Sequence, residues 1–502
     1  MAAKKENKDP AFDLYRKVEE LLGIDLRSLG LFRILIGILI IVDLCIRVTS
    51  LGAHYTDAGV VPRQLVFEYG EQPWFFSFHM LSGDIFLQVV LFLLAGLSAF
   101  SLAIGYRSRI ACFICWVLML SLHVRNPFVN NLGDWLLVNL LFWGMFLPLG
   151  ARFSIDNQLK PAGQKIPVYS LSIATLAVIL QMCLVYFLSV THKISPVWHT
   201  EGTAIQFALN LDRITSGLGQ SLLMLPESWL QFMTFSTLFL ERWGPVLVFF
   251  PWFIGPCRTG VACLFISFHI GLALFFELGL FPYICMAGWV LLLPAWYWDR
   301  IKAVGDWSSF LSEKVFVPEG LLVRLKQLAI REIRVIPGIT ESLLSVFFLF
   351  CMLLSSMLYG GVMDVAFYDS IYSRVEPVVH TLNMRQRWDM FSPSPPTTDG
   401  WFVVVGYAED GQAVNLFSPE DAVSWSRPAS IAETYRNQRW RKYLEWVMTK
   451  GGPYEKSFVA YCESYGTNPG SSNEVEEVAV YFMQERTLED LVAANVIRKQ
   501  LK

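Results

Sequence analysis

Long apolar segments recur along most of this chain and constrain its fold more than any other feature. A helix needs about 20 mostly apolar residues to cross the hydrocarbon core of a bilayer. Nine segments approach that length, at residues 29–46, 84–104, 109–123, 134–150, 168–191, 229–254, 260–279, 281–298 and 340–359. Because several of them are short or contain a charge, we expect a polytopic α-helical membrane protein with eight or nine spans.

Composition supports this class and excludes others. The 502 residues are 54% hydrophobic and 17% charged, whereas soluble domains carry about 25% charged residues. Residues 360–502 contain 14 Lys+Arg and 19 Asp+Glu, so the deficit of charge lies in the first 359 residues. A net charge of -3 argues against nucleic acid as a partner. Most of the nine cysteines lie in or next to apolar segments, which argues against a disulfide framework.

The basic residues predict the orientation. With the N-terminus in the cytoplasm, the cytoplasmic connections contain 19 Lys+Arg and the opposite side contains 5, the asymmetry expected of membrane proteins. Nine spans then place the C-terminal domain outside the cytoplasm. The expected order is a cytoplasmic N-terminal segment at 1–28, a membrane domain at 29–300, an amphipathic cytoplasmic segment at 301–337, a last transmembrane helix at 338–360 and an extracytoplasmic domain at 361–502.

Two regions outside the apolar segments have patterns of their own. Residues 301–337 are amphipathic and basic, typical of helices on the cytoplasmic leaflet, although an ordinary packed connecting helix explains them equally well. The C-terminal region predicts a small α+β domain. It contains a hairpin with a Gly turn at 401–416, helices at 430–450 and 457–465, and a strand at 475–484.

Lys193 belongs to the most concentrated set of polar residues near an apolar segment. It closes the fifth segment, Pro196 stops the helix, Trp198 suits an interface, and Gly202 opens an amphipathic stretch. This order predicts a helix, a break and a short re-entrant or interfacial helix on the non-cytoplasmic side. An apolar niche disfavours the charged form of a lysine, which would make it a neutral base. The commoner alternative is a lysine that extends from a helix end to the lipid headgroups.

Other polar residues have competing explanations. Asn130, Asn131 and Asp134 lie between the third and fourth segments, where a helix-capping turn with Asp134 as the N-cap is favoured over a binding site. Glu241 either pairs with the adjacent arginine or faces a cavity. His269 lies in mid-helix, where a hydrogen-bonded packing residue is commoner than a ligand.

Several familiar motifs are absent from the sequence. It has no GxxxxGK[ST], no GxGxxG after a strand, no HExxH and no paired CxxC array. ATP hydrolysis, dinucleotide binding and zinc proteolysis therefore lack support, and we predict no metal site. The two similar halves of many transporters are also not evident, which weakens transport as a third hypothesis.

Several short motifs together resemble one family. They are Leu31-Phe32-Arg33-Ile34, Tyr55-x-Asp57-x-Gly59-x-x-Pro62, Asn130-Asn131 with Gly133-Asp134, Phe146-Leu147-Pro148-Leu149-Gly150, Lys193 with Trp198 and Gly202, Glu241 to Pro245, and the helix with His269. Over residues 25 to 300 their order and spacing are similar to the HTTM (horizontally transferred transmembrane) family. The best-known members of this family are the vitamin K-dependent gamma-glutamyl carboxylases.

The resemblance implies a chemistry. The matching lysine of the carboxylases deprotonates vitamin K hydroquinone; the oxygenated quinone then removes a glutamate γ-proton, and the carbanion captures carbon dioxide. The resemblance thus implies a quinol as cofactor. It makes Lys193, His192, Asn130 and Asn131 the catalytic candidates. The substrate-binding candidates are Trp198, Gly202, Asp134, Glu241 and His269.

The sequence also departs from the carboxylases. His192 stands in place of the first lysine of a pair, and Leu132 follows Asn131 where the carboxylases have a histidine. The large ectodomain is absent, and residues 386–393 match a Q-x-W-x-MF-x-P signature of bacterial HTTM proteins. These differences favour a bacterial inner-membrane protein with a chemistry other than glutamate carboxylation, or none.

Two functional hypotheses follow. The first is an enzyme that acts on a quinol or another lipid-soluble substrate, with Lys193 as its base. The second is a non-catalytic lipid- or quinone-binding or membrane-organising protein, in which Lys193 pairs with a headgroup or with Glu241. The expected partners are membrane lipid, a quinone and, for the enzyme, an extracytoplasmic protein substrate.

Overall fold

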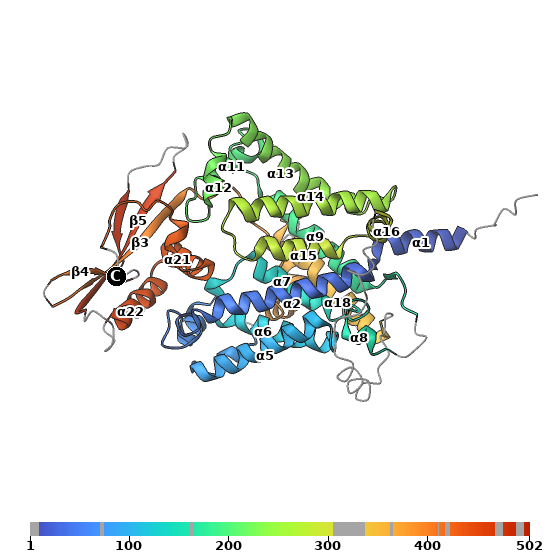
Figure 1. The fold of residues 1–502 in the computed structure, drawn as a ribbon, viewed down its shortest axis with the longest axis horizontal. Helices are drawn as coiled ribbons and strands as arrows, with labels where there is room; N and C mark the ends of the chain where they lie inside the picture. Colours follow the sequence, from blue (N-terminus) through green and yellow to red (C-terminus); the bar gives the residue numbers. More distant parts are fainter. Residues whose placement is uncertain are drawn as a thin grey trace, which may run out of the picture.

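The structure is a computed structural model, and it forms a helical bundle with a small sheet at one end (Figure 1). It describes residues 10–70, 75–160, 165–304, 337–361, 365–409, 411–416, 422–466, 475–487 and 496–501. The predicted amphipathic segment at 301–337 therefore lies almost entirely outside the described residues.

Six helices in the described part of the chain are long and apolar enough to cross a membrane. They are α2 (Leu26–Val48), α5 (Ile85–Ile104), α6 (Ser108–Arg125), α9 (Ile173–His192), α14 (Ile254–Phe275) and α18 (Ile339–Tyr359). A seventh span exists if α15 (Phe281–Leu291) and α16 (Ala295–Val304), which meet at a 90° bend, count as one. The total of nine stays a prediction.

The two remaining predicted spans are helical but differ from the six. α13 (Glu227–Val248) has 22 residues, yet Glu241 and Arg242 make it more polar. α7 (Leu132–Gly144) has only 13 residues, about 20 Å at 1.5 Å per residue, against about 30 Å for the hydrocarbon core. Residues 145–150 are apolar, but they form turns rather than continuing α7.

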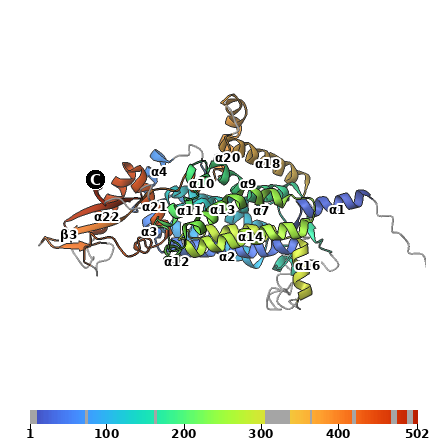
Figure 2. The same cartoon turned by 90° about the horizontal axis from the view of Figure 1, so that it is seen from above.

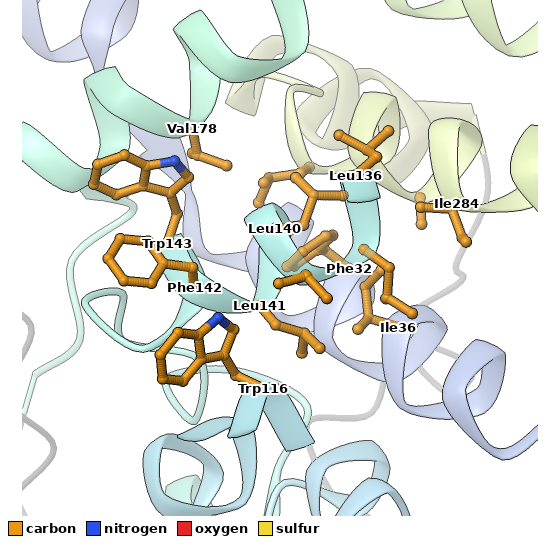
Figure 3. Close-up of a cluster of buried hydrophobic side chains, with 14 of the residues drawn as sticks. Phe32, Ile36, Trp116, Leu136, Leu140, Leu141, Phe142, Trp143, Val178 and Ile284 are labelled. Carbon is orange, nitrogen blue, oxygen red and sulfur yellow. The ribbon is translucent and has the colours of Figure 1, made fainter. Parts of the chain in front are cut away.

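α7 is the centre of the largest apolar core. Nearly all its residues are buried, as expected of a helix that is hydrophobic on every side. Figure 3 shows the side chains that surround it, from α2, α6, α9 and α15. They include Phe32, Ile36, Trp116, Val178 and Ile284, packed with Leu136, Leu140, Leu141, Phe142 and Trp143 of α7 itself.

Short elements connect the long helices at both ends of the bundle. Near the N-terminus lie α1 (Pro10–Leu22), α8 (Ile155–Gln158) and a two-stranded sheet of β1 (Ile24–Asp25) and β2 (Tyr169–Ser170). The other connections are α3 (Leu51–Tyr55), α4 (Arg63–Tyr69), η1 (Phe78–Met80), η2 (Pro127–Val129), α10 (Pro196–His199), α11 (Ala204–Leu209) and α12 (Gly217–Leu222).

The C-terminal domain confirms the predicted small sheet. Its antiparallel order is β4 (Ala413–Asn415), β3 (Thr398–Tyr407), β5 (Glu477–Arg486) and β6 (Ile497–Gln500). Its helices are η4 (Ala432–Thr434), α21 (Gln438–Lys450) and α22 (Pro453–Gly466), and α19 (Val365–Phe367), η3 (Tyr368–Tyr372) and α20 (Ser373–Thr381) precede the sheet. The first predicted helix begins eight residues later than expected, because Asn437 caps α21 through the backbone N–H groups of Arg439 and Trp440.

The N-terminal helix α1 and the C-terminal sheet lie at opposite ends of the bundle (Figures 1 and 2). The predicted odd number of crossings would place the two ends in this way, and the number of crossings stays a prediction. The assignment of the N-terminal end to the cytoplasm stays a prediction.

Gly37 permits the close approach of α2 and α5. A Cβ at this position would lie 2.8 Å from the backbone nitrogen of Ala103. We therefore expect Gly37→Ala to destabilise the bundle by about 1–3 kcal/mol through overpacking. Unfolding in detergent micelles measures this change. Gly96→Ala on α5 is the matched control, because no atom lies within 4 Å of the added Cβ; equal stability losses in the two variants would contradict the prediction.

Candidate functional site

Lys193 is buried at the end of α9. Its ammonium forms an ion pair with Glu241 of α13 and donates to the Ser189 hydroxyl at 3.1 Å. The nitrogen also lies 4.8 Å from the centre of the Trp198 ring, within cation–π range. Lys193 and Glu241 are each only 2% exposed. The side chain therefore does not extend to the lipid headgroups.

The chain turns sharply after Lys193, and short helices follow, as predicted. Pro196 occupies the first position of α10, where its missing N–H costs nothing. Gly202 then adopts φ +70°, and a Cβ there would also lie 2.9 Å from the Phe235 ring. The predicted Gly202 is thus required for its backbone conformation and its close packing.

Residues 382–393, here called the strap, follow α20 and extend to the break after Lys193. The strap covers the break after α9, since Trp198 Nε1 donates to the Phe391 carbonyl at 3.1 Å and Ser195 N to the Pro393 carbonyl at 3.3 Å. Its Gln386 exchanges amide hydrogen bonds with Gln181 of α9, at 2.8 and 3.1 Å. The Q-x-W-x-MF-x-P signature is therefore packed against the Lys193 region, a position that the sequence did not predict.

His269 belongs to a separate buried group. Trp289 Nε1 donates to the Tyr186 hydroxyl at 2.8 Å, and that hydroxyl lies 2.7 Å from His269 Nε2. Tyr186 therefore joins Trp289 and His269 in one hydrogen-bonded group. His269 is thus a hydrogen-bonded packing residue, and within the described residues no hydrogen bond joins it to Lys193.

The turn before α7 corrects one expectation. Asn131, not Asp134, is the N-cap, and its Oδ1 accepts from Gly133 N at 2.7 Å and Asp134 N at 3.2 Å. Asp134 occupies the third helical position and accepts from Asn131 N at 2.7 Å, which completes a capping box. The expectation was wrong because Asn131 can fill the cap itself, which leaves Asp134 free to pair with arginines.

Asn130 lines a small cavity of about 50 Å³. Its amide nitrogen donates to the His123 carbonyl at 2.8 Å, while its buried Oδ1 has no partner in the described structure. His123 also lines the cavity; neither of its ring nitrogens has a hydrogen bond in the described structure, and Nε2 lies 3.5 Å from Asp134 Oδ1. The rest of the lining consists of Val66, Gly70, Phe75, Val124, Pro127, Trp135 and Asn383. Neither Lys193 nor His192, whose Nδ1 lies 2.6 Å from the Leu188 carbonyl, is part of it.

Four charged side chains form a buried network beside this cavity. Arg47 of α2 contacts Asp43 and Asp134, each at 2.7 Å. Arg439, from α21 of the C-terminal domain, contacts the same two carboxylates. Together with His123, the two aspartates have the spacing of a metal site, but each of their four oxygens already accepts a hydrogen bond from an arginine. The arrangement is an ion-pair network rather than a metal centre.

The C-terminal domain is joined to the membrane part over a wide surface. Val60, Val61 and Phe128 share one apolar core with Trp440 and Tyr443. Further contacts come from Arg213, which reaches Asp399 at 3.2 Å and Glu445 at 3.4 Å. Burial alone would raise the pKa of Glu445, but Lys442, Arg441 and Arg213 outweigh it and lower that pKa to about 2. The two parts of the chain therefore form one packed unit.

Comparison with known proteins supports the resemblance. A family model described as HTTM domain matches residues 23–297, more than half of the chain. The chain belongs to the HTTM domain family. No curated protein and no solved structure matches it. The HTTM domain and the apolar helices make it a multi-pass integral membrane protein. The HTTM match includes Lys193, Glu241 and the Asn130–Asn131 turn, whereas the strap and Arg439 lie outside it.

His54 is buried where the C-terminal domain meets the membrane part, and we expect it to make the protein less stable in acid. Its ring lies 4.5 Å from the Trp440 ring, and burial, with the charges of Arg47, Arg439 and Arg436, lowers its pKa to about 3. Between the unfolded pKa near 6.5 and this value the unfolded state binds more protons. Stability is therefore expected to fall with decreasing pH by about 1.4 kcal/mol per pH unit from this group.

Unfolding in micelles between pH 7 and 4 tests this expectation. The variant His54→Phe removes the titrating ring, so its stability should decline less steeply than that of the wild type. Parallel declines in the two proteins would contradict the role of His54.

Proposed function

We propose that this HTTM protein is an intramembrane enzyme that acts on a quinol or another lipid-soluble substrate, with Lys193 and Glu241 together as its base. The observation that carries the proposal is the buried Lys193–Glu241 ion pair at a helix break. Burying a charged group within a membrane segment costs free energy, and such groups are retained mainly at functional sites. The bacterial inner membrane and an extracytoplasmic site belong to the same proposal.

The Lys193–Glu241 pair can form a neutral base without leaving an unpaired charge in the membrane. Transfer of the ammonium proton from Lys193 to Glu241 leaves a neutral amine beside a neutral acid. The amine then takes a proton from a substrate hydroxyl, and the resulting ammonium is stabilised by Trp198 and balances the substrate oxyanion. Because Lys193 is 2% exposed, the substrate gains access when the strap or α10 moves.

The other predicted residues have supporting roles in this proposal. Asn130 offers its unpartnered oxygen to a substrate donor at the cavity, which Lys193 does not line, and Asn131 caps the helix that follows this turn. A vitamin K hydroquinone-type substrate fits the HTTM resemblance. Leu132, in place of the carboxylase histidine, argues against glutamate as the second substrate.

A specific observation favours the alternative, a non-catalytic lipid- or quinone-binding or membrane-organising protein. The Lys193 ammonium has an ion pair with Glu241, a hydrogen bond to Ser189 and a cation–π contact with the Trp198 ring. A fully satisfied pair can serve stability alone, by fixing α9 against α13.

The decisive assay supplies purified protein in lipid with a reduced quinone and labelled bicarbonate. We expect the wild type to oxidise the quinol and Lys193→Ala to lose at least 100-fold in rate, the lower range for a general base. Arg242→Gln is the matched control, since Arg242 is exposed next to Glu241 on α13. Absence of oxidation in all three proteins would contradict the enzyme, and absence of label alone would eliminate its carboxylase version.

A paired substitution separates catalysis from stability. Lys193→Met or Glu241→Gln alone should cost about 3–5 kcal/mol, because each leaves a buried partner without its counter-charge. The double variant Lys193→Met with Glu241→Leu should recover most of the stability in an unfolding experiment, yet have no quinol oxidation. A stable double variant that retains full activity would contradict the proposed base.

A further inference from the structure

The C-terminal domain holds the turn that carries Asn130 and Asn131. Arg439 of α21 donates to the Val129 carbonyl at 3.0 Å, directly before the two asparagines. It also contacts Asp134, whose carboxylate accepts from Asn131 N at 2.7 Å. The Arg439 guanidinium thus contacts the turn directly, at the Val129 carbonyl, and indirectly, through the Asp134 carboxylate that accepts from Asn131 N.

The same domain also contacts a residue next to the cavity lining at a second place. The Tyr454 hydroxyl donates to the Tyr69 carbonyl at 3.2 Å, and the adjacent Gly70 lines the cavity. The Tyr454 ring also lies 4.8 Å from Phe128, which belongs to the turn itself. Helices α21 and α22 therefore contact residues that adjoin the cavity lining at Gly70 and at Asn130.

Arg439 is also needed for charge balance. The network contains two carboxylates, Asp43 and Asp134, and two guanidinium groups, Arg47 and Arg439, all almost fully buried. Without Arg439, two buried carboxylates would share one arginine. The C-terminal domain therefore supplies one of the two guanidinium groups that balance these carboxylates, and His123 Nε2 lies 3.5 Å from Asp134 on the membrane side.

We propose that Arg439 is a positioning residue for the Asn130–Asn131 turn, and that the C-terminal domain is a cap that keeps this turn and its cavity in shape. The proposal rests on the proposed function in one respect, that Asn130 and Asn131 belong to the site. Its test uses no activity, so the two can fail separately.

Hydrogen–deuterium exchange of the full-length protein in lipid measures the effect. In Arg439→Leu we expect amide exchange within residues 127–134 to rise at least tenfold, with exchange in the middle of α14 unchanged. Arg436→Leu is the matched control, because Arg436 is exposed one turn away on the approach to α21. Unchanged exchange in the turn of Arg439→Leu would overturn the proposal.

A second substitution separates positioning from simple charge balance. The double variant Arg439→Leu with Asp43→Asn retains one carboxylate, Asp134, and one arginine, Arg47, so its buried charges balance. We therefore expect its unfolding midpoint to return toward that of the wild type, while amide exchange in the turn stays fast. Recovery of both would show that Arg439 acts only as a counter-charge and would overturn the proposal. If Arg439→Leu fails to fold, Arg439→Lys replaces it, because lysine retains the charge but not the forked geometry of the guanidinium. We expect amide exchange in the turn of Arg439→Lys to be faster than in the wild type. Exchange at the wild-type rate would overturn the proposal.

Discussion

The buried network of Asp43, Arg47, Asp134 and Arg439 is the interaction on which the rest of this structure depends. Burying a charge is costly, and removing one partner from a buried pair leaves a group that neither water nor protein stabilises. Here the four partners come from α2, α7 and the C-terminal α21. The network therefore joins the start of the membrane part, its central helix and the last domain of the chain.

The HTTM domain of this protein is completed by segments that follow it in the chain. The family match ends at residue 297, yet two later segments complete its buried polar contacts. The strap covers the helix break after Lys193 through Trp198 and Gln181, and α21 supplies Arg439. Both proposed parts of the site, the Lys193–Glu241 pair and the Asn130–Asn131 turn, are thus closed by segments outside the matched domain.

Local sequence was enough to predict much of the fold. Runs of apolar residues predicted the long helices, the hairpin with a Gly turn predicted β3, and alternation predicted β5. The expected span at 134–150 was too long, because the apolar residues after Gly144 pack as turns inside the protein, where apolar character no longer indicates a helix. β6 was missed because its residues are exposed and do not alternate.

The site was predictable only in part, for a physical reason. Lys193, Glu241 and Asp134 stood out because charges next to apolar segments are costly, and the Lys193–Glu241 pairing was among the alternatives considered. Arg439 has no such signal, since it lies in a polar helix near Arg436 and Arg441, and its partner Asp134 is 305 residues away. Asp134 was expected to be the N-cap but occupies the third helical position, because Asn131 fills the cap, and the arginine contacts of Asp134 are long-range.

The central claim, that Arg439 and Asp134 couple the C-terminal domain to the membrane part, is tested most directly by a thermodynamic double-mutant cycle. Unfolding free energies of the wild type, Arg439→Gln, Asp134→Asn and the double variant give the coupling energy between the two side chains. We predict a coupling energy of about 2 kcal/mol or more between Arg439 and Asp134. A coupling below about 0.5 kcal/mol, the range of independent sites, would contradict it.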